Sequence, residues 1–177
     1  MTANGPMTKI FDFTHMYDFV NPSRNCCVFL RYRNSSLYGH IQNDPNLSIF
    51  KFIVDKAQLG TILDDIQADF TLFVPTDEEI MKRFSQNVFV NMDKGEAYAL
   101  VKSSLLDRRL PSEIIQNSPA AYFTTKYPPN KLFITNINGK TTLNKTVDVI
   151  KKDIMCDNGI IHYTNNLVNT QLELQSN

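Results

Sequence analysis

The side chains of this chain that most readily do chemistry near neutral pH are three histidines and three cysteines. His162 lies within the apolar stretch CDNGIIHYTNNLV, and His15 and His40 are distant from it in sequence. A metal site needs further ligands at short spacing, and we identify none beside these histidines. The sequence also lacks a G-x-S-x-G elbow, a P-loop and a G-x-G-x-x-G turn. We therefore expect His162 to be a hydrogen-bonded strand residue, with no catalytic residue, metal or cofactor in the chain.

The cysteines and the acidic cluster have structural explanations. Cys26 and Cys27 are adjacent and Cys156 is far away, so this odd set is expected to be reduced, although a bond from Cys156 to either neighbour stays open. In the stretch PTDEEI, Thr76 and Glu79 fit a capping box, in which each side chain satisfies a backbone donor at a helix start. The cluster is therefore interpreted as a helix start rather than as a metal or acid–base site.

Composition limits the classes of partner. The 177 residues contain 18 basic and 18 acidic side chains, so no overall field attracts nucleic acid. The first 20 residues lack the apolar run of a signal peptide, and no stretch is apolar enough to insert into a membrane. We expect a soluble protein made in the cytoplasm, whose sequons at Asn34, Asn46 and Asn144 are chance matches.

The hydrophobic periodicity of the sequence predicts the helices and strands that would position His162. Residues 44–60 predict a helix that stops at Gly60, a short second helix or turn follows, and residues 70–74 predict a buried strand ended by Pro75. Another helix is predicted over residues 93–107. Asn-Gly pairs at positions 138–139 and 158–159 predict turns between later strands. Helices come first and strands later, so the fold class is α+β.

Residues 1–36 differ from the rest because they are rich in aromatic and basic side chains. Two interpretations stay open: an arm that docks on a partner, or an extension that packs on its own domain. The candidate partner-binding residues of this arm are Phe11, Phe13, Tyr17, Phe19, Phe29, Arg31, Tyr32 and Arg33.

Two stretches resemble the paired signatures of the fasciclin (FAS1) domain. FTLFVPTDEEI resembles the first, a strand followed by Pro-Thr-Asp and a helix, and DNGIIHYTNNLV resembles the second, near the end of the domain. The resemblance covers residues 37–170, leaving 171–177 as a tail. It implies a wedge-shaped, seven-stranded β-sandwich with several packed α-helices and an N-terminal extension. The implied structural residues are Thr71, Phe73, Pro75, Thr76, Asp77, Asn158, Gly159 and His162.

FAS1 domains usually act in adhesion and matrix assembly rather than catalysis, so the resemblance implies a non-enzymatic protein with other proteins as partners. Because no export signal is evident, the sequence favours a structural component of a large assembly made inside cells, such as a minor capsid protein incorporated into a virion. The alternative is a cell-surface or extracellular-matrix adhesion module.

Overall fold

The structure, a computed structural model, describes residues 32–168. The candidate arm residues Phe11, Phe13, Tyr17, Phe19, Phe29 and Arg31 lie outside the described residues, as do Cys26, Cys27 and the predicted tail.

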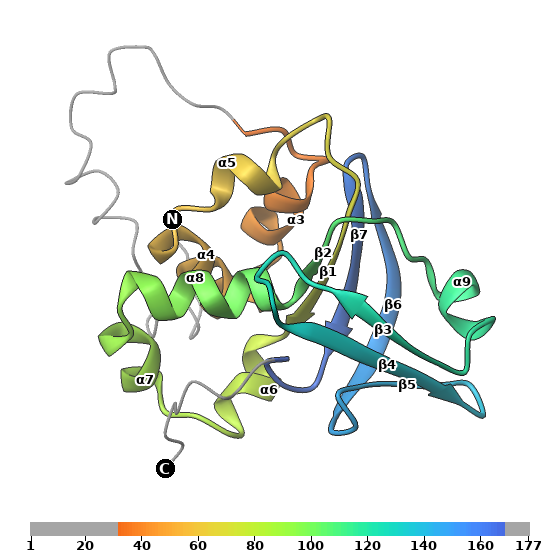
Figure 1. Ribbon diagram of the computed structural model, residues 1–177. Coiled ribbons are helices and arrows are strands. Elements are labelled where there is room, and N and C mark those ends of the chain that lie inside the picture. Colours follow the sequence, from red (N-terminus) through yellow and green to blue (C-terminus); the bar gives the residue numbers. More distant parts are fainter. Residues whose placement is uncertain (1–31, 169–177) are drawn as a thin grey trace.

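Helices dominate the first half of the described chain and strands the second half (Figure 1). The helices are α3 (Leu37–Asn43), the 3-10 turn η2 (Pro45–Leu47), α4 (Ser48–Lys56), α5 (Gly60–Leu63), α6 (Asp77–Met81), α7 (Gln86–Asn91), α8 (Lys94–Ser103) and α9 (Ser112–Gln116). The strands are β1 (Phe70–Pro75), β2 (Leu105–Leu106), β3 (Ala120–Thr124), β4 (Lys131–Ile137), β5 (Lys140–Leu143), β6 (Val147–Cys156) and β7 (Gly159–Thr164). The predicted α+β class and the seven strands are confirmed.

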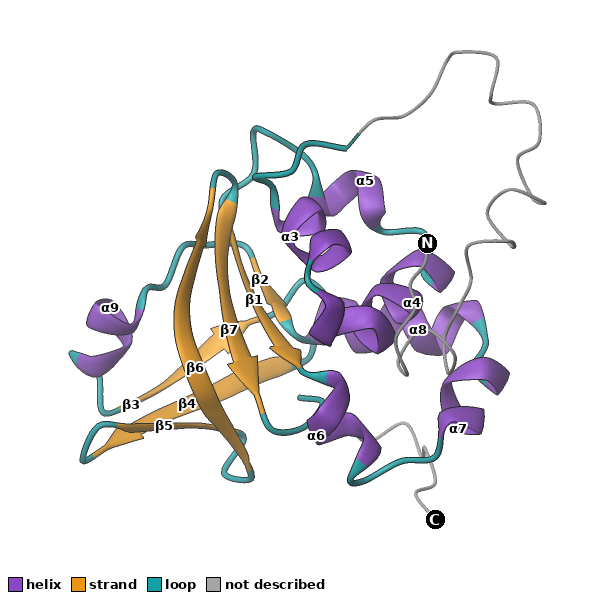
Figure 2. Cartoon of the chain, turned by 180° about the vertical axis from the view of Figure 1, so that it is seen from behind, coloured by secondary structure: helices purple, strands orange, loops and turns teal. Residues whose placement is uncertain are grey.

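The seven strands are hydrogen-bonded in the order β2-β1-β7-β6-β5-β4-β3. The long strand β6 pairs with β5 at its start, through Val147 and Asp148, and with β7 over the rest of its length. Two register shifts interrupt the β6–β7 ladder, and Asp153, within the second shift, has a positive φ of 63°. Such bulges bend a strand. Figure 2 shows β6 curving so that β3, β4 and β5 cross the direction of β1 and β7.

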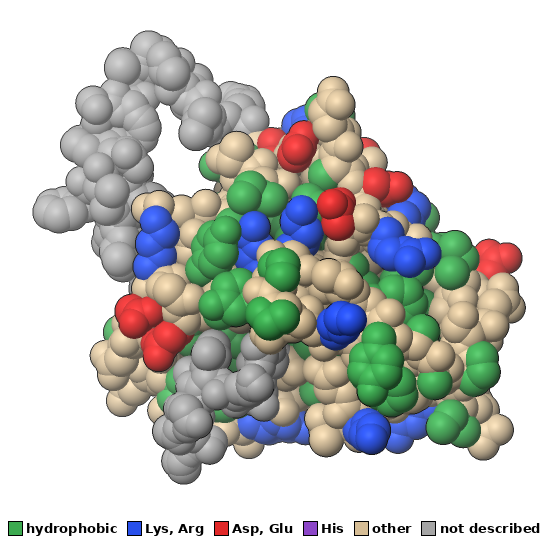
Figure 3. All heavy atoms as spheres, in the orientation of Figure 1, with side chains coloured by type: hydrophobic (Ala, Val, Ile, Leu, Met, Phe, Trp, Pro, Cys, Tyr) green, Lys and Arg blue, Asp and Glu red, His purple; other side chains and the backbone are tan. Residues whose placement is uncertain are grey.

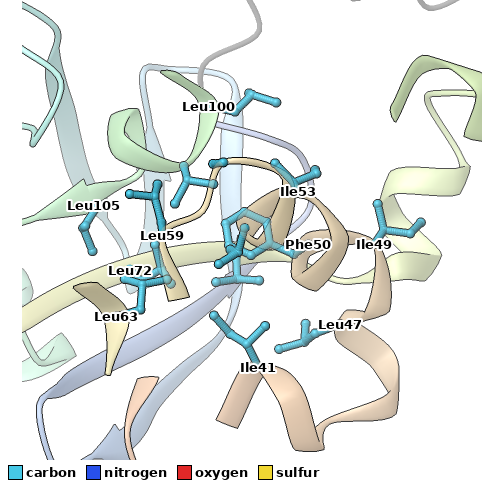
Figure 4. Packing of buried hydrophobic residues seen from close by; sticks show 14 of the residues in the cluster. Ile41, Leu47, Ile49, Phe50, Ile53, Leu59, Leu63, Leu72, Leu100 and Leu105 are labelled. Carbon is cyan, nitrogen blue, oxygen red and sulfur yellow. The ribbon is translucent and has the colours of Figure 1, made fainter. Parts of the chain in front are cut away.

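The larger core lies between the helices and one face of β1 and β7. Phe50 of α4 lies at its centre, surrounded by side chains that include Ile41 of α3, Leu72 of β1 and Leu100 of α8 (Figure 4). A smaller core on the opposite face includes Phe73 of β1 and side chains of β4, β5 and β6. All six residues of β1 and all six of β7 are buried, because both faces of this parallel pair are covered.

Asp77 connects the end of β1 to the helical layer. Its carboxylate accepts hydrogen bonds from Ser48 N, at 3.1 Å, from Ser48 Oγ, at 2.7 Å, and from Ile49 N, at 2.7 Å, at the start of α4. Burial raises the pKa of Asp77 above its ordinary value, and these hydrogen bonds oppose that rise. Asp77 thus caps a helix other than the one it begins.

Local predictions agree with the structure at one turn and differ from it at two element ends. Asn138 and Gly139 form the expected turn, with φ of 53° and 81°. The helix predicted over residues 93–107 ends at Ser103, because Leu105 and Leu106 pair with β1 instead. Gly60 does not stop α4 but begins α5. The left-handed residue after α4 is Gln58, with φ of 59°.

The predicted capping box at Thr76 is found in part. Thr76 Oγ1 accepts a hydrogen bond from Glu79 N at 3.4 Å, while the Glu79 carboxylate pairs with Lys82 and Arg83. A complete box occurs instead at the start of α8, where Asp93 and Glu96 bond each other's backbone.

The last residues of the predicted arm contact the domain. Arg33 pairs with Asp157, and Ser36 accepts a hydrogen bond from Gly39 N at the start of α3. The Tyr32 ring lies 4.5 Å from that of Tyr38, centroid to centroid. Residues 32–36 therefore fit the interpretation of an extension packed on its own domain, and the division into residues 1–36, 37–170 and 171–177 stays a prediction.

Substituting Gly159→Ala should lower the free energy of unfolding by about 1–3 kcal/mol, the usual cost of overpacking. A Cβ at this position would lie closer to the Phe70 carbonyl than such atoms approach in real proteins, because β1 and β7 pair there. Urea denaturation measures the change. The control is Gly95→Ala in α8, where a Cβ makes an ordinary contact of 3.4 Å and should stabilise the helix by up to about 1 kcal/mol. Equal unfolding midpoints for the Gly159 variant and wild type would contradict the close approach.

Candidate functional site

His162 lies in β7, opposite Phe73 of β1, and its side chain is 1% exposed. The imidazole stacks on the Phe73 ring with centroids 5.4 Å apart. Its Nδ1 accepts a hydrogen bond from Asp153 N at 3.1 Å, and its Nε2 lies 2.8 Å from the Leu110 carbonyl oxygen. A ring that accepts at Nδ1 and donates from Nε2 is the neutral Nε2–H tautomer.

This environment leaves His162 without a free nitrogen for chemistry. Burial lowers the pKa of His162 below 6.5, more than the Leu110 carbonyl and Asp153 raise it. Protonation would also place a proton on Nδ1 against the N–H of Asp153. His162 accepts the hydrogen bond of the Asp153 N–H at the β6 bulge, so both ring nitrogens contact backbone groups.

Thr71 of β1 bonds the same loop as His162. Thr71 Oγ1 donates to the Arg108 carbonyl at 2.6 Å and accepts from Leu110 N at 2.8 Å. At the end of this loop, the Asp153 carboxylate accepts from Ser112 N at 2.8 Å and from Ser112 Oγ, at the start of α9. Residues 108–112, called here the 108–112 segment, are therefore fixed by β1, β6 and β7 together.

Asn158 has a similar role at the other end of β7. Its amide oxygen accepts from Leu37 N at 2.8 Å, and its amide nitrogen donates to the carbonyls of Leu63 and Asp65. It thus joins the β6–β7 turn to α3 and to the end of α5.

The predicted site residues do not converge on one cavity. Thr71, Phe73 and His162 adjoin on the side of the smaller core, Asn158 and Gly159 lie at the β6–β7 turn, and Pro75, Thr76 and Asp77 lie where β1 meets α6. Tyr32 packs on Tyr38 of α3, and Arg33 pairs with Asp64 and Asp157.

Sequence reasoning missed one polar cluster. His40 Nε2 donates to Tyr163 Oη at 2.7 Å, and Tyr163 Oη donates to the carboxylate of Asp44, which lies 3.7 Å from His40. The spacing of His40 and Asp44, four residues apart where a helix ends, could have indicated it. Burial raises the pKa of Tyr163 above its ordinary value, and Asp44 raises it further. A tyrosine so stabilised in its neutral form is a poor nucleophile, and the cluster joins α3 to β7.

The thiol of Cys156 is a poor nucleophile as well. Cys156 is a free thiol whose pKa burial raises to about 11, so it is protonated at neutral pH. Within residues 32–168, no group of three or more His, Cys, Asp or Glu side chains could hold a metal ion. No helix in this part of the chain is long and apolar enough to cross a membrane.

In a comparison with protein families, the model of the Fasciclin domain matches residues 45–169, which are most of the chain. The chain belongs to the fasciclin (FAS1) domain family. The sequence resemblance is thereby confirmed, and with it the expected FAS1-like fold.

A search of solved structures finds a FAS1 domain pair from the insect cell adhesion molecule Fasciclin I, with a TM-score of 0.67 and 19% sequence identity. The match covers 80% of this chain and 53% of that one, so the chain spans about half the length of the domain pair. At this identity the likeness shows the fold alone. No curated protein matches the chain.

Substituting His162→Ala should lower the free energy of unfolding by about 1–3 kcal/mol, because the Asp153 N–H and the Leu110 carbonyl lose their buried partner. Chemical denaturation at neutral pH measures the loss. His40→Ala, at a partly exposed histidine, is the control and should cost less. An unchanged midpoint for the His162 variant would show that these bonds stabilise nothing.

Acidification should destabilise the FAS1 domain as the pH falls through 6.5, the unfolded-state pKa of histidine. Because the pKa of folded His162 is depressed, its stabilising contribution is complete above pH 6.5 and is lost below it. Burial also lowers the pKa of His40, so His40 contributes to the same loss of stability on acidification. Urea midpoints at about pH 7.5 and 5.5 measure the loss, which should be smaller for His162→Gln than for wild type. Equal pH dependence in both proteins would contradict the burial of a neutral His162.

Proposed function

We propose that this chain is a non-enzymatic protein-binding module that acts in adhesion. Membership of the FAS1 family carries the proposal. The buried, fully bonded His162 and the raised pKa values of Tyr163 and Cys156 support it, because they leave these groups unfit for catalysis. Equal numbers of acidic and basic residues favour proteins over nucleic acid as partners.

The sequence alone favoured a minor capsid protein, but no comparison supports a virion, and the family match favours the alternative of a surface or matrix module. Two sequons are compatible with an extracellular location. The side chains of Asn34 and Asn46 are exposed, whereas the Asn144 amide oxygen accepts a hydrogen bond from Phe133 N at 2.9 Å.

Surfaces coated with the purified chain should retain several-fold more cells than surfaces coated with the same protein after heat unfolding. Binding through a folded surface is the reason for the expected difference. Attachment is counted after washing, with albumin-coated wells as the background. Equal attachment to folded and unfolded protein would contradict an adhesion role. Recovery of the native protein from its source in particles of uniform large size would favour the capsid alternative.

If the protein is exported in a glycosylating host, Asn34 and Asn46 should carry glycans and Asn144 should not, because its amide is held in the β4–β5 region. Mass spectrometry of the native protein before and after enzymatic deglycosylation measures occupancy. A glycan on Asn144 would contradict that geometry, and bare Asn34 and Asn46 would count against an extracellular location.

A further inference from the structure

β3 is an edge strand that hydrogen-bonds to β4 along its length. Within residues 32–168, the other side of β3 meets the sheet only just past its end. There Lys126 N donates to the Leu105 carbonyl at 2.9 Å, and Leu106 forms a bridge with Thr125. The sheet thus closes at one point and stays open along Ala120–Thr124.

The register shows which backbone groups face this opening. Phe133 of β4 bonds Asn144 through both its N–H and its carbonyl, so these groups point toward β5. Tyr122, directly opposite Phe133, is therefore in a pair without mutual hydrogen bonds, and its N–H and carbonyl point away from β4. The N–H and carbonyl of Thr124 point the same way, because every second residue of a strand directs its backbone groups to the same side. Lys126, two residues on, uses this direction to bond Leu105.

The opening follows from the contacts of the 108–112 segment. After β2, Thr71 and His162 bind Arg108 and Leu110 and draw the chain along β1 and β7. The chain consequently does not continue the pairing with β3. A hollow of about 480 Å³ remains, lined by residues that include Asp107, Arg108, Tyr122, Phe123, Lys126 and Pro128.

Aromatic side chains flank both faces of the open edge. Tyr122 is 68% exposed and lies against Phe133, with ring centroids 4.6 Å apart. Phe123 points to the opposite face, where the Arg108 guanidinium lies 5.3 Å from its ring centroid. Figure 3 shows hydrophobic and basic side chains side by side on the face over β3 and β4. An added strand would place its alternate side chains beside Tyr122 and beside Phe123.

The charge at this edge is positive. Arg108 and Lys131, which lies opposite Thr124, are exposed, and neither has an ion-pair partner in the described part of the chain. Lys126 pairs with Asp107 at 3.4 Å, the one carboxylate of the hollow. Positive charge favours an acidic ligand and disfavours edge-to-edge pairing of two copies, which would bring like charges together.

We propose that the open edge of β3 binds an acidic, extended segment of a partner protein, which adds to the sheet as a strand through the backbone of Tyr122 and Thr124. This inference names the docking surface and the class of partner, and it rests on the proposed protein-binding function. The main-chain bonds supply affinity, and Arg108 and Lys131 select for carboxylates.

The test uses the full chain and a fluorescein-labelled peptide of about eight alternating Val and Glu residues, the length of a typical strand. Anisotropy should report binding that weakens as salt is raised. A Val–Lys peptide of the same length should bind far more weakly. The Val–Glu peptide N-methylated at two adjacent central residues, which blocks both edges of the strand, should not bind. Equal binding of the methylated peptide would overturn strand addition.

Variants locate the site. Arg108→Glu with Lys131→Glu should weaken Val–Glu binding about tenfold or more. Lys82→Glu, just after α6, reverses an exposed charge outside the hollow and should leave binding unchanged. Bound peptide should also slow hydrogen exchange of the Tyr122 and Thr124 amides. No binding by wild type, equal loss in the Lys82 variant, or unaltered exchange at these amides would overturn the proposal.

Two further results would distinguish a failure of the β3 docking site from a failure of the proposed adhesion role. Cell attachment that survives in the Arg108/Lys131 variant, together with absent peptide binding, would reject the β3 edge and leave the adhesion role intact. Peptide binding without any cell attachment would reject the adhesion role and keep the docking site. Self-association of the chain in sedimentation, lost on Tyr122→Pro, would assign the edge to a second copy and overturn the acidic partner.

Discussion

The parallel pairing of β1 with β7 is the constraint on which the rest of the structure depends. The two strands run side by side from Phe70 and Gly159 to Pro75 and Thr164, and both faces of the pair are buried. One face supplies Leu72 and Ile161 to the helical core, and the other presents Phe73 and His162. Because neither face meets water, each polar group there needs a partner within the protein.

The buried polar side chains supply those partners and thereby fix the surrounding loops. His162 and Thr71 bind the 108–112 segment, Asn158 binds the start of α3 and the end of α5, and Asp77 caps α4. These side chains, which belong to the two family signatures, all bond backbone groups. The 108–112 segment is thus held beside β1 and β7, and within residues 32–168 the open side of β3 meets β2 only just past its end.

The sequence was sufficient for features encoded locally. The buried strand before Pro75, the Asn138 turn and the position of His162 within a strand could all be predicted from short patterns. Features that depend on contacts between residues distant in the sequence could not be predicted in this way. Leu105 and Leu106 continue a helical pattern and become a strand only because β1 lies beside them. Likewise, the hollow beside β3 joins residues 107–108 to residues 122–128, and no local pattern shows that they meet.

Amide hydrogen exchange of the free FAS1 domain tests the central claim most directly, namely that Thr71 and His162 hold the 108–112 segment and leave β3 open. We expect slow exchange for the amides of Leu110 and Asp153, which donate to Thr71 Oγ1 and His162 Nδ1. We expect fast exchange for the amides of Tyr122 and Thr124. Fast exchange at Leu110 and Asp153, or protection of Tyr122 and Thr124 without a ligand, would contradict this claim.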